Sequence, residues 1–420
     1  MNSRERLIKT INHQETDQIV TDLGSTLVTG ISASALAKLR KHLGLKDEWV
    51  KVHEPFQLLG YVEEDLRRRL SIDVVGVSGP VTMFGYKNEG WKQWKMPDGT
   101  NVLVGKEFNT TIDEKGNTLI YPQGDTSVEP SGKLPKEGFY FDGLVRQKEI
   151  IPEKLNGKKD YGDDFKIMND DDLRYIEEQI NHYYYNTDYG INLGNFVAGL
   201  GDFAPLTGPG LKETRGIRDV EEWLIAHYLY PNYIHEIFDY QTEIALKNLQ
   251  LLKEATGKKA QIIQISGTDF GTQQCEIMSP DTFREFYKPY YTKLNKWVHE
   301  NTEWKTFYHC CGSVVKLLDD FVDMGIDILN PVQCSAKGME AQFLKDNYGD
   351  KFVFWGGGVD TQHTLPFGTP DEVSKEVTNR LEIFSKGGGF VFNPIHNIQG
   401  PTPVENIVAM FDAVQAFNKK

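Results

Sequence analysis

Eight short apolar segments recur along this chain, and each has the pattern of a buried parallel strand. They are residues 18–23, 72–77, 195–201, 260–266, 305–311, 326–332, 352–358 and 390–396. Strands that alternate with helices form a parallel sheet, and eight of them close into a barrel. The sequence therefore predicts an α/β fold, a (β/α)8 TIM barrel, with its functional site where the strands end.

Helical patterns fill the gaps between these strands. Residues 219–256, 279–301 and 369–385 have helical spacing of apolar positions. Asp219, Ser279 and Thr369 stand where an N-cap is expected, and Pro280 and Pro370 occupy the first helical position.

The connection between the second and third strands is far longer than an ordinary β-to-α loop. Residues 85–190 contain a Pro-Asp-Gly turn and a Lys-Gly-Asn turn between alternating apolar residues, which predicts β-hairpins. We expect a barrel of residues 1–84 and 191–420 with a β-rich insertion after strand 2. The insertion is rich in Trp, Tyr and Phe. These aromatics either shape a substrate lid or pack the small subdomain onto the barrel.

Charge and composition exclude several classes of protein. The 420 residues carry a net charge of -14, which argues against nonspecific nucleic-acid binding. The N-terminal segment is charged throughout, and no apolar run approaches the roughly 20 residues that span a bilayer. We expect a cytoplasmic enzyme with no membrane partner. Its four cysteines favour thiol chemistry or metal binding over disulfides.

The end of the fifth predicted strand reads His309-Cys310-Cys311. Residues two apart in a strand face the same side, so His309 and Cys311 point together and Cys310 points away. An imidazole beside a thiolate supplies half of the ligands of a zinc site. The alternative is that both residues fill the barrel interior and bind no metal.

A catalytic zinc needs a third protein ligand and one open position. His396, at the end of the eighth strand, reaches across the barrel mouth. Cys334, just past the sixth strand, lies on a neighbouring strand. We expect His309, Cys311 and His396 to bind Zn²⁺, with Cys334 as the alternative third ligand.

Other polar residues stand near the predicted strand ends. Asp269 follows the fourth strand, Gln333 follows the sixth, and Asp73 begins the second. We expect catalytic roles for these three. Taken singly, such residues are more often caps or turn residues, but their convergence on one end of a barrel favours a shared site.

Several segments together resemble the uroporphyrinogen decarboxylase superfamily. They are GTDFGTQ, SPDTFREFYKPYY, FYHCCGSVVKLLDDFVDMGIDILNPVQ, FVFWGGGVDTQ and GGGFVFNPIHNIQGPTPVENIVAM, all in the C-terminal half. The resemblance implies a (β/α)8 barrel. It also implies one of two activities, the decarboxylase itself or a zinc-dependent, corrinoid-linked methyltransferase.

Residues distinguish these two branches. The decarboxylases carry an arginine-rich N-terminal segment that binds substrate carboxylates, but here the region reads VTDLGSTLVTGISASALAKL, without arginine. The methyltransferases carry His-x-Cys at a strand end, which His309 and Cys311 match, and a late Cys where this chain has His396. One Cys fewer in the ligand set favours polarisation of a bound oxygen over activation of a thiolate.

The sequence thus leads to one hypothesis and several alternatives. We expect a zinc-dependent methyltransferase that moves a methyl group between a small methylated substrate, such as a methoxylated aromatic, and the cobalt of a separate corrinoid protein. Asn330, Gly357 and Asn397 are the residues expected to contact the cofactor. The oligomeric state is left open, with a homodimer as one alternative. The alternatives are a decarboxylase that uses Arg215 and Arg218, a coenzyme M or folate methyltransferase, and a non-catalytic metal- or corrinoid-binding module.

Overall fold

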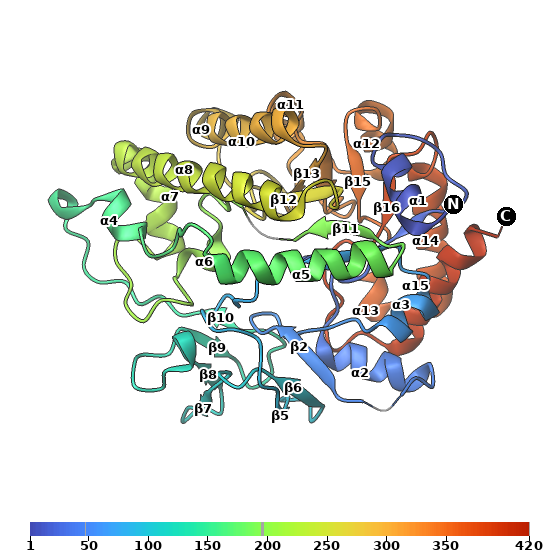
Figure 1. Ribbon diagram of the computed structural model, residues 1–420, viewed down its shortest axis with the longest axis horizontal. Helices are drawn as coiled ribbons and strands as arrows, with labels where there is room; N and C mark the ends of the chain where they lie inside the picture. Colours follow the sequence, from blue (N-terminus) through green and yellow to red (C-terminus); the bar gives the residue numbers. More distant parts are fainter. Residues whose placement is uncertain (47, 195–196, 420) are drawn as a thin grey trace.

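The computed structural model describes residues 1–46, 48–194 and 197–419. Eight parallel strands form one sheet, in the order β4, β11, β12, β13, β14, β15, β16, β1. Their bounds are β1 Val20–Thr21, β4 Val74–Val77, β11 Gly190–Leu193, β12 Ile262–Ser266, β13 Lys305–His309, β14 Ile328–Asn330, β15 Val353–Trp355 and β16 Phe390–Phe392. The predicted (β/α)8 barrel is confirmed (Figure 1).

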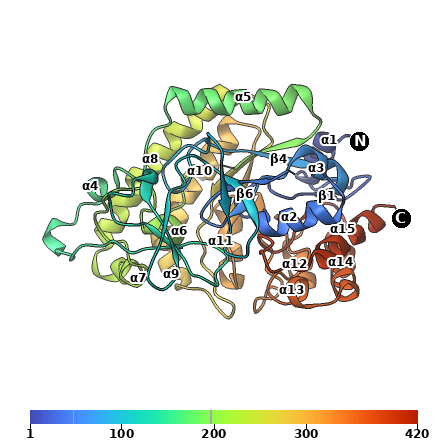
Figure 2. The same cartoon turned by 90° about the horizontal axis from the view of Figure 1, so that it is seen from below.

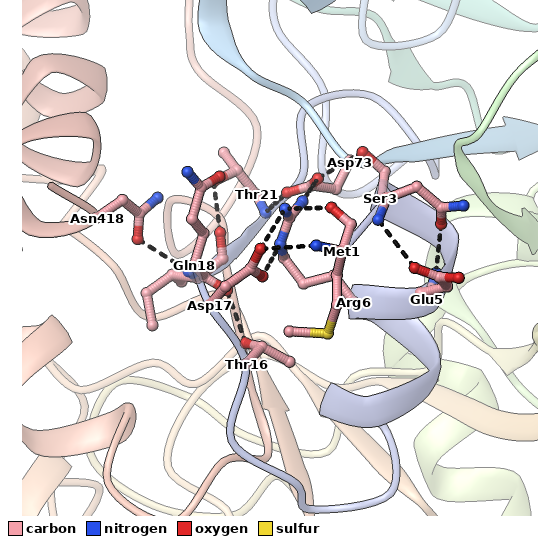
Figure 3. Close-up of polar contacts among 12 residues, drawn as sticks. Met1, Ser3, Glu5, Arg6, Thr16, Asp17, Gln18, Thr21, Asp73 and Asn418 are labelled. Carbon is pink, nitrogen blue, oxygen red and sulfur yellow. Dashed lines mark hydrogen bonds and ion pairs between the residues drawn. The ribbon is translucent and has the colours of Figure 1, made fainter.

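The first and last strands of this order, β4 and β1, meet through Thr21 and Asp73. The Asp73 amide donates to the Thr21 carbonyl at 2.8 Å, and the Thr21 amide donates to Asp73 Oδ2 at 3.0 Å. Arg6 of α1 (Ser3–Thr10) reaches Asp73 Oδ1 at 2.6 Å and also binds Asp17 (Figure 3). These contacts close the barrel at the amino ends of its strands.

The barrel interior is apolar at this end. Each strand points alternate residues inward, and the inward set packs with Leu7 and Ile11 of α1. This floor of the barrel consists of Val20, Val74, Ile262, Phe307, Ile328, Val353, Trp355 and Val391 together with Val28 from the loop after β1. Branched and aromatic side chains of this kind fill the interiors of such barrels.

The helices surround the sheet, and the predicted caps are present. Side chains of Asp219, Ser279 and Thr369 accept backbone N–H bonds in the first turns of α7, α9 and α14. Two of the predicted helices are each divided into two helices. One break is at Tyr230, just before Pro231, and the other is at Tyr287, two residues before Pro289. The bounds are α2 Ala33–His42, α3 Glu64–Leu70, α4 Gly157–Tyr161, α5 Asp170–Asn186, α6 Phe203–Leu206, α7 Val220–Leu229, α8 Pro231–Thr256, α9 Pro280–Phe286, α10 Lys288–Asn301, α11 Leu318–Asp323, α12 Ala341–Tyr348, α13 Thr364–Phe367, α14 Pro370–Phe384 and α15 Val404–Phe417, with short 3-10 turns at Pro122–Gly124, Pro152–Lys154 and Val315–Leu317.

The third strand lies earlier than predicted. The structure places β11 at Gly190–Leu193, and residues 197–201 contain no strand, while residues 195–196 of the predicted segment lie outside the described part. The prediction followed the longer apolar segment after β11, whose own sequence carries the polar Asn192.

Two small four-stranded sheets lie beside the barrel. One contains β7 Thr110–Ile112, β8 Thr118–Ile120, β9 Gly132–Leu134 and β10 Asp142–Gly143. The other contains β2 Val50–Glu54, β3 Leu59–Gly60, β5 Lys92–Lys95 and β6 Asn101–Val104. An isolated bridge joins Ser32, which follows β1, to Leu59 of β3. The second sheet therefore lies on the side where the barrel strands end.

The predicted boundaries of the insertion do not match these sheets. Strands β5 to β10 fall within residues 85–190, but β2 and β3 come from the connection between the first two barrel strands and pair in the same sheet as β5 and β6. Conversely, α5 lies within residues 85–190 and packs against β4, β11 and α8. Figure 1 shows the small sheets below α5 and the helices α8 to α11 above it.

The two ends of the chain lie near each other at one end of the molecule in both views (Figure 2). Within the described residues, no helix combines the length and the apolar composition needed to cross a bilayer.

Candidate metal centre

Strand β13 presents His309 and Cys311 on one side. Phe307 belongs to the apolar floor, so His309, two residues later, also points inward. Cys311 Sγ lies 3.3 Å from His309 Nε2. The intervening Cys310 is buried in the opposite direction, where its sulfur accepts the Phe270 N–H at 3.2 Å.

His396, which follows β16, completes a group of three donors. The ligand atoms of His309, Cys311 and His396 all lie within 4.8 Å of one another, and the two imidazole rings are 5.4 Å apart. Zn–S bonds of about 2.3 Å and Zn–N bonds of about 2.1 Å at tetrahedral angles separate donors by about 3.5 Å. Small side-chain adjustments satisfy that spacing, so the residues present fit zinc.

Asn330 fixes which nitrogen of His309 faces this group. The Asn330 amide nitrogen donates to the Trp355 carbonyl at 2.9 Å, so its oxygen faces His309 Nδ1 at 2.6 Å. Since an amide oxygen only accepts, Nδ1 must carry the proton. The lone pair of Nε2 is therefore directed toward Cys311, the arrangement found for metal-binding histidines.

Both histidines are held neutral. Burial lowers the pKa of His309 to about 4, against the Asn330 hydrogen bond, which acts to raise it. Burial, reinforced by His309, also lowers the pKa of His396 to about 4, opposed by the charge of Asp269. A neutral imidazole has a free lone pair, so both rings are available as ligands near neutral pH.

The loop after β12 positions Cys311. Asp269 Oδ1 accepts the Cys311 N–H at 2.6 Å and lies 3.8 Å from His309 Nε2. A Cβ on Gly312 would lie 2.4 Å from the Gly271 carbonyl carbon, so the two loops pack backbone against backbone. Only glycine permits this approach.

Acidic groups surround the three donors. Burial raises the pKa of Asp269, and burial together with the charge of Asp269 raises the pKa of Asp202 to about 7. Burial also raises the pKa of the Cys311 thiol well above its usual value. A thiol in such surroundings becomes a thiolate ligand only when a cation compensates its charge.

The other expected site residues do not all lie beside the three donors. Gln333 lies beside the donors, because its Oε1 accepts the Gly312 N–H at 2.7 Å. The Asn397 side chain instead accepts the Gly30 N–H and donates to the Leu27 carbonyl, so it ties down the loop after β1. Gly357 packs tightly against the Val332 backbone.

Asn330, Gly357 and Asn397 are all buried, so they present no surface to a large cofactor. The expected cofactor contacts are therefore not found at these positions. Cys334 is also buried and does not belong to the three-donor group.

Asp73 is a correction to the expected catalytic set. It stands at the amino end of β4, where Arg6, Ser3 and Thr21 bind its carboxylate (Figure 3). The three donors lie at the carboxyl ends of β13 and β16, so Asp73 faces the opposite end of the barrel. Its position at the start of a strand already indicated this placement.

Three polar residues in or near the barrel interior were not singled out from the sequence: Asp202, Asn192 and Gln264. Asp202 caps a short helix in a loop without a recognisable motif, and Asn192 lies in the strand that was misplaced. Gln264 lies in a correctly predicted strand. An amide at an inward position of an otherwise apolar strand could have marked it as a candidate site residue.

Comparisons with known proteins point to one family. The profile of the family described as Uroporphyrinogen decarboxylase (URO-D) matches residues 206–417. The chain is 30% identical over 178 residues to the Methylcobamide:CoM methyltransferase MtaA of Methanosarcina barkeri, which covers 42% of this chain and 47% of that protein. It is 24% identical over 188 residues to the Uroporphyrinogen decarboxylase of Psychromonas ingrahamii, covering 44% and 48%. The chain thus spans about half the length of the curated relatives it matches.

A solved structure has the same architecture over the whole chain. The methyltransferase from Methanosarcina mazei superposes with a TM-score of 0.56 and 18% identity, covering 99% of both chains. At this identity the likeness shows the fold and nothing of the chemistry.

Proposed function

Since the chain belongs to the uroporphyrinogen decarboxylase family, we propose that it is the zinc-dependent methyltransferase type of that family. It moves a methyl group between a small methylated substrate and the cobalt of a separate corrinoid protein. The observation that carries this proposal is the group of His309, Cys311 and His396 with the His309 tautomer fixed by Asn330. A relative named as a methylcobamide methyltransferase supports the same activity.

These three residues would hold the zinc, and the remaining groups orient them. A bound zinc supplies Lewis-acid polarisation of the heteroatom that gains or loses the methyl group. Asn330 keeps Nε2 of His309 unprotonated, and Asp269 holds the loop that carries Cys311. Asp269 also stands 3.8 Å from His309 Nε2, where we propose that it handles the proton of the heteroatom.

The corrinoid is proposed to arrive on a partner protein. The interior of the barrel is filled by the side chains of its apolar floor, which leaves no room for a cofactor of that size. A partner would present the cobalt to the barrel mouth, where the hairpins β5 to β10 within residues 85–190 are proposed to form a lid.

In the demethylating direction the methyl group leaves the substrate oxygen. The carbon–oxygen bonding pair stays on that oxygen, which takes up a proton. The methyl carbon bonds to cobalt through an electron pair that cobalt(I) supplies, so cobalt is formally oxidised to cobalt(III). A methoxylated aromatic is the proposed donor class.

The decarboxylase alternative has the names of other relatives in its favour, but one of the two arginines assigned to it is already paired. Arg218 is fully buried and forms a two-pronged ion pair with Asp164. Arg215 is exposed, and its carbonyl accepts the Arg218 Nε–H. A substrate with several carboxylates needs several unpaired guanidinium groups at the site, so the engaged Arg218 favours methyl transfer.

Anaerobic visible spectroscopy tests the proposal. Zinc-loaded protein is mixed with cob(I)alamin and 2-methoxyphenol, and in a second assay with methylcob(III)alamin and coenzyme M. We expect methylation of cobalt in the first assay, dependent on zinc and absent in Cys311→Ala. Zinc-independent turnover, or decarboxylation of a porphyrinogen by metal-free protein, contradicts the proposal.

A further inference from the structure

Two buried amide side chains inside the barrel have no hydrogen-bond partner among the described residues. Asn192 of β11 and Gln264 of β12 are each 0% exposed, and both the oxygen and the nitrogen of each amide are unpaired. Buried polar groups in folded proteins are nearly always paired. Two such amides on neighbouring strands therefore need an explanation.

Both amides point into the barrel. Ile191 and Leu193 flank Asn192 and pack in the outer core, between sheet and helices. On β12, Ile262 belongs to the apolar floor, so Gln264, two residues later, faces the interior as well.

The register places Gln264 close to the metal centre. Gln264 lies opposite Phe307, and His309 follows two residues later on that strand. The two amides thus occupy the interior tier between the apolar floor and the metal ligands. Branched apolar residues dominate this position in barrels of this type, so amides here are not required by the fold.

The ionisable side chains that border this tier include acidic ones. Asp269 lies 3.8 Å from His309 Nε2, and its Oδ1 accepts the Cys311 N–H. Asp22, also inward, accepts the Trp355 indole N–H at 3.0 Å. A sulfonate or carboxylate group bound here would face these acidic side chains.

We infer that Asn192 and Gln264 bind the hydroxyl or ether oxygens of a small uncharged methylated substrate and hold it beneath the His309, Cys311 and His396 group. An amide offers one donor and one acceptor side, which complements such oxygens without adding charge. The inference rests on the proposed methyl transfer and narrows its substrate class to neutral alcohols, phenols and their methyl ethers.

Residues 25–28, in the loop after β1, cover the tier. A Cβ on Gly76, the partner of Asn192 across the sheet, would lie 2.1 Å from the Ser25 carbonyl oxygen, and Val28 packs with the apolar floor. This segment belongs to no helix or strand.

Binding of one uncharged probe tests the inference. Calorimetric titration of the zinc-loaded full chain with 2-methoxyphenol is compared among wild type, Asn192→Leu, Gln264→Met and Gln241→Leu. Gln241 of α8 is a matched control, because its amide oxygen is also buried and unpaired but lies outside the barrel. Thermal unfolding without the probe is measured for all four proteins.

We expect both interior variants to bind the probe at least about tenfold more weakly and the control to bind it like wild type. Replacing an unpaired buried amide by an apolar side chain of similar shape removes a desolvation penalty, so the unfolding midpoint of the interior variants should not fall. Coenzyme M, a sulfonate, should not displace the probe.

Four results overturn the inference. Two concern the interior variants: binding of the probe like wild type by both, or a lowered unfolding midpoint, which would make the amides structural. The third is displacement of the probe by coenzyme M, and the fourth is a zinc-loaded wild type that does not bind 2-methoxyphenol. That result leaves the metal centre and the methyl transfer to be judged by the zinc-dependent cobalt assay.

Discussion

The imidazole of His309 and the thiol of Cys311 meet because a strand turns alternate residues to the same side. The end of β13 shows this alternation directly, since Cys311 faces His309 and Cys310 faces the Phe270 amide. At the scale of single residues, the proposed centre therefore depends on which side of one strand each group occupies.

Cys311→Ala and Cys310→Ala separate these two roles. Loss of a direct ligand should lower zinc affinity by more than the roughly 10- to 100-fold found for residues that only orient ligands. Cys310→Ala should keep zinc affinity and lose only some stability, because its sulfur packs in the core. Zinc titration against a chromophoric chelator measures both. Equal losses of affinity would mean that the strand alternation is not what assembles the site.

Asn330 tests the orientation of His309. Asn330→Ala removes the acceptor for Nδ1–H, so the ring can bind metal with the wrong nitrogen protonated. We expect zinc affinity to fall about 10- to 100-fold. Asn295→Ala is the control, because Asn295 of α10 is a similarly buried amide. It donates to the Met324 carbonyl, which follows α11. An Asn330 variant with unchanged zinc affinity would remove the orienting role.

At the scale of elements, two loops decide where the ligands lie. The loops after β12 and β13 approach so closely that Gly312 and Gly271 leave no room for a Cβ. The arrangement of the proposed ligands is thus a consequence of backbone packing between neighbouring βα loops, with the strands as a rigid base.

Gly312→Ala tests this packing against a control. Gly312 (φ 90°) and Gly257 (φ 58°) both have positive φ, but a Cβ on Gly257 meets nothing within 4 Å. Gly257→Ala should cost about 1 kcal/mol of unfolding free energy from backbone strain alone. Gly312→Ala should cost more and also weaken zinc binding, because Cys311 is displaced. Denaturant titration and zinc titration measure the two effects, and equal behaviour of the variants would contradict the account.

The elements also show why sequence reasoning succeeded and where it failed. Seven strands were located correctly, because most of their inward and outward residues are apolar and form nearly continuous runs. Strand β11 was missed because the segment that follows it, residues 195–201, has a similar apolar pattern. The pairing of β2 with β6 was beyond reach, since their contact joins segments separated by a whole barrel strand.

Two of the three donors could be paired from the sequence because their spacing is local. His309 and Cys311 face the same side through strand periodicity, and the structure places His396 within 4.8 Å of both. The position of Asp202 and the surroundings of Asn192 depend on how loops distant in the sequence fold over the barrel mouth. No local sequence pattern predicts this. Asp73 was assigned to the site although it begins a strand, and the structure places it at the opposite end.

At the scale of the whole molecule, the two ends of the barrel have separate tasks. The amino ends of the strands are closed by α1, whose Arg6 forms a buried ion pair with Asp73, with side chains 8% and 7% exposed. The carboxyl ends carry the donors. Stability at one end and chemistry at the other is the usual division in this fold.

Arg6→Met tests this division. It leaves the Asp73 carboxylate buried without its cation, so we expect a loss of about 3–5 kcal/mol of unfolding free energy. The folded variant should bind zinc as tightly as wild type, because the pair is remote from the donors. Denaturant unfolding and zinc titration below the unfolding midpoint are the measurements. Loss of zinc affinity in a fully folded variant would contradict the division.

Zinc K-edge X-ray absorption of the zinc-loaded protein tests the central claim most directly. The account predicts bound zinc with one sulfur at about 2.3 Å and two imidazole nitrogens at about 2.1 Å, together with a lighter exchangeable ligand. A zinc shell with two sulfurs, or protein that retains no zinc, would contradict the assignment of His309, Cys311 and His396.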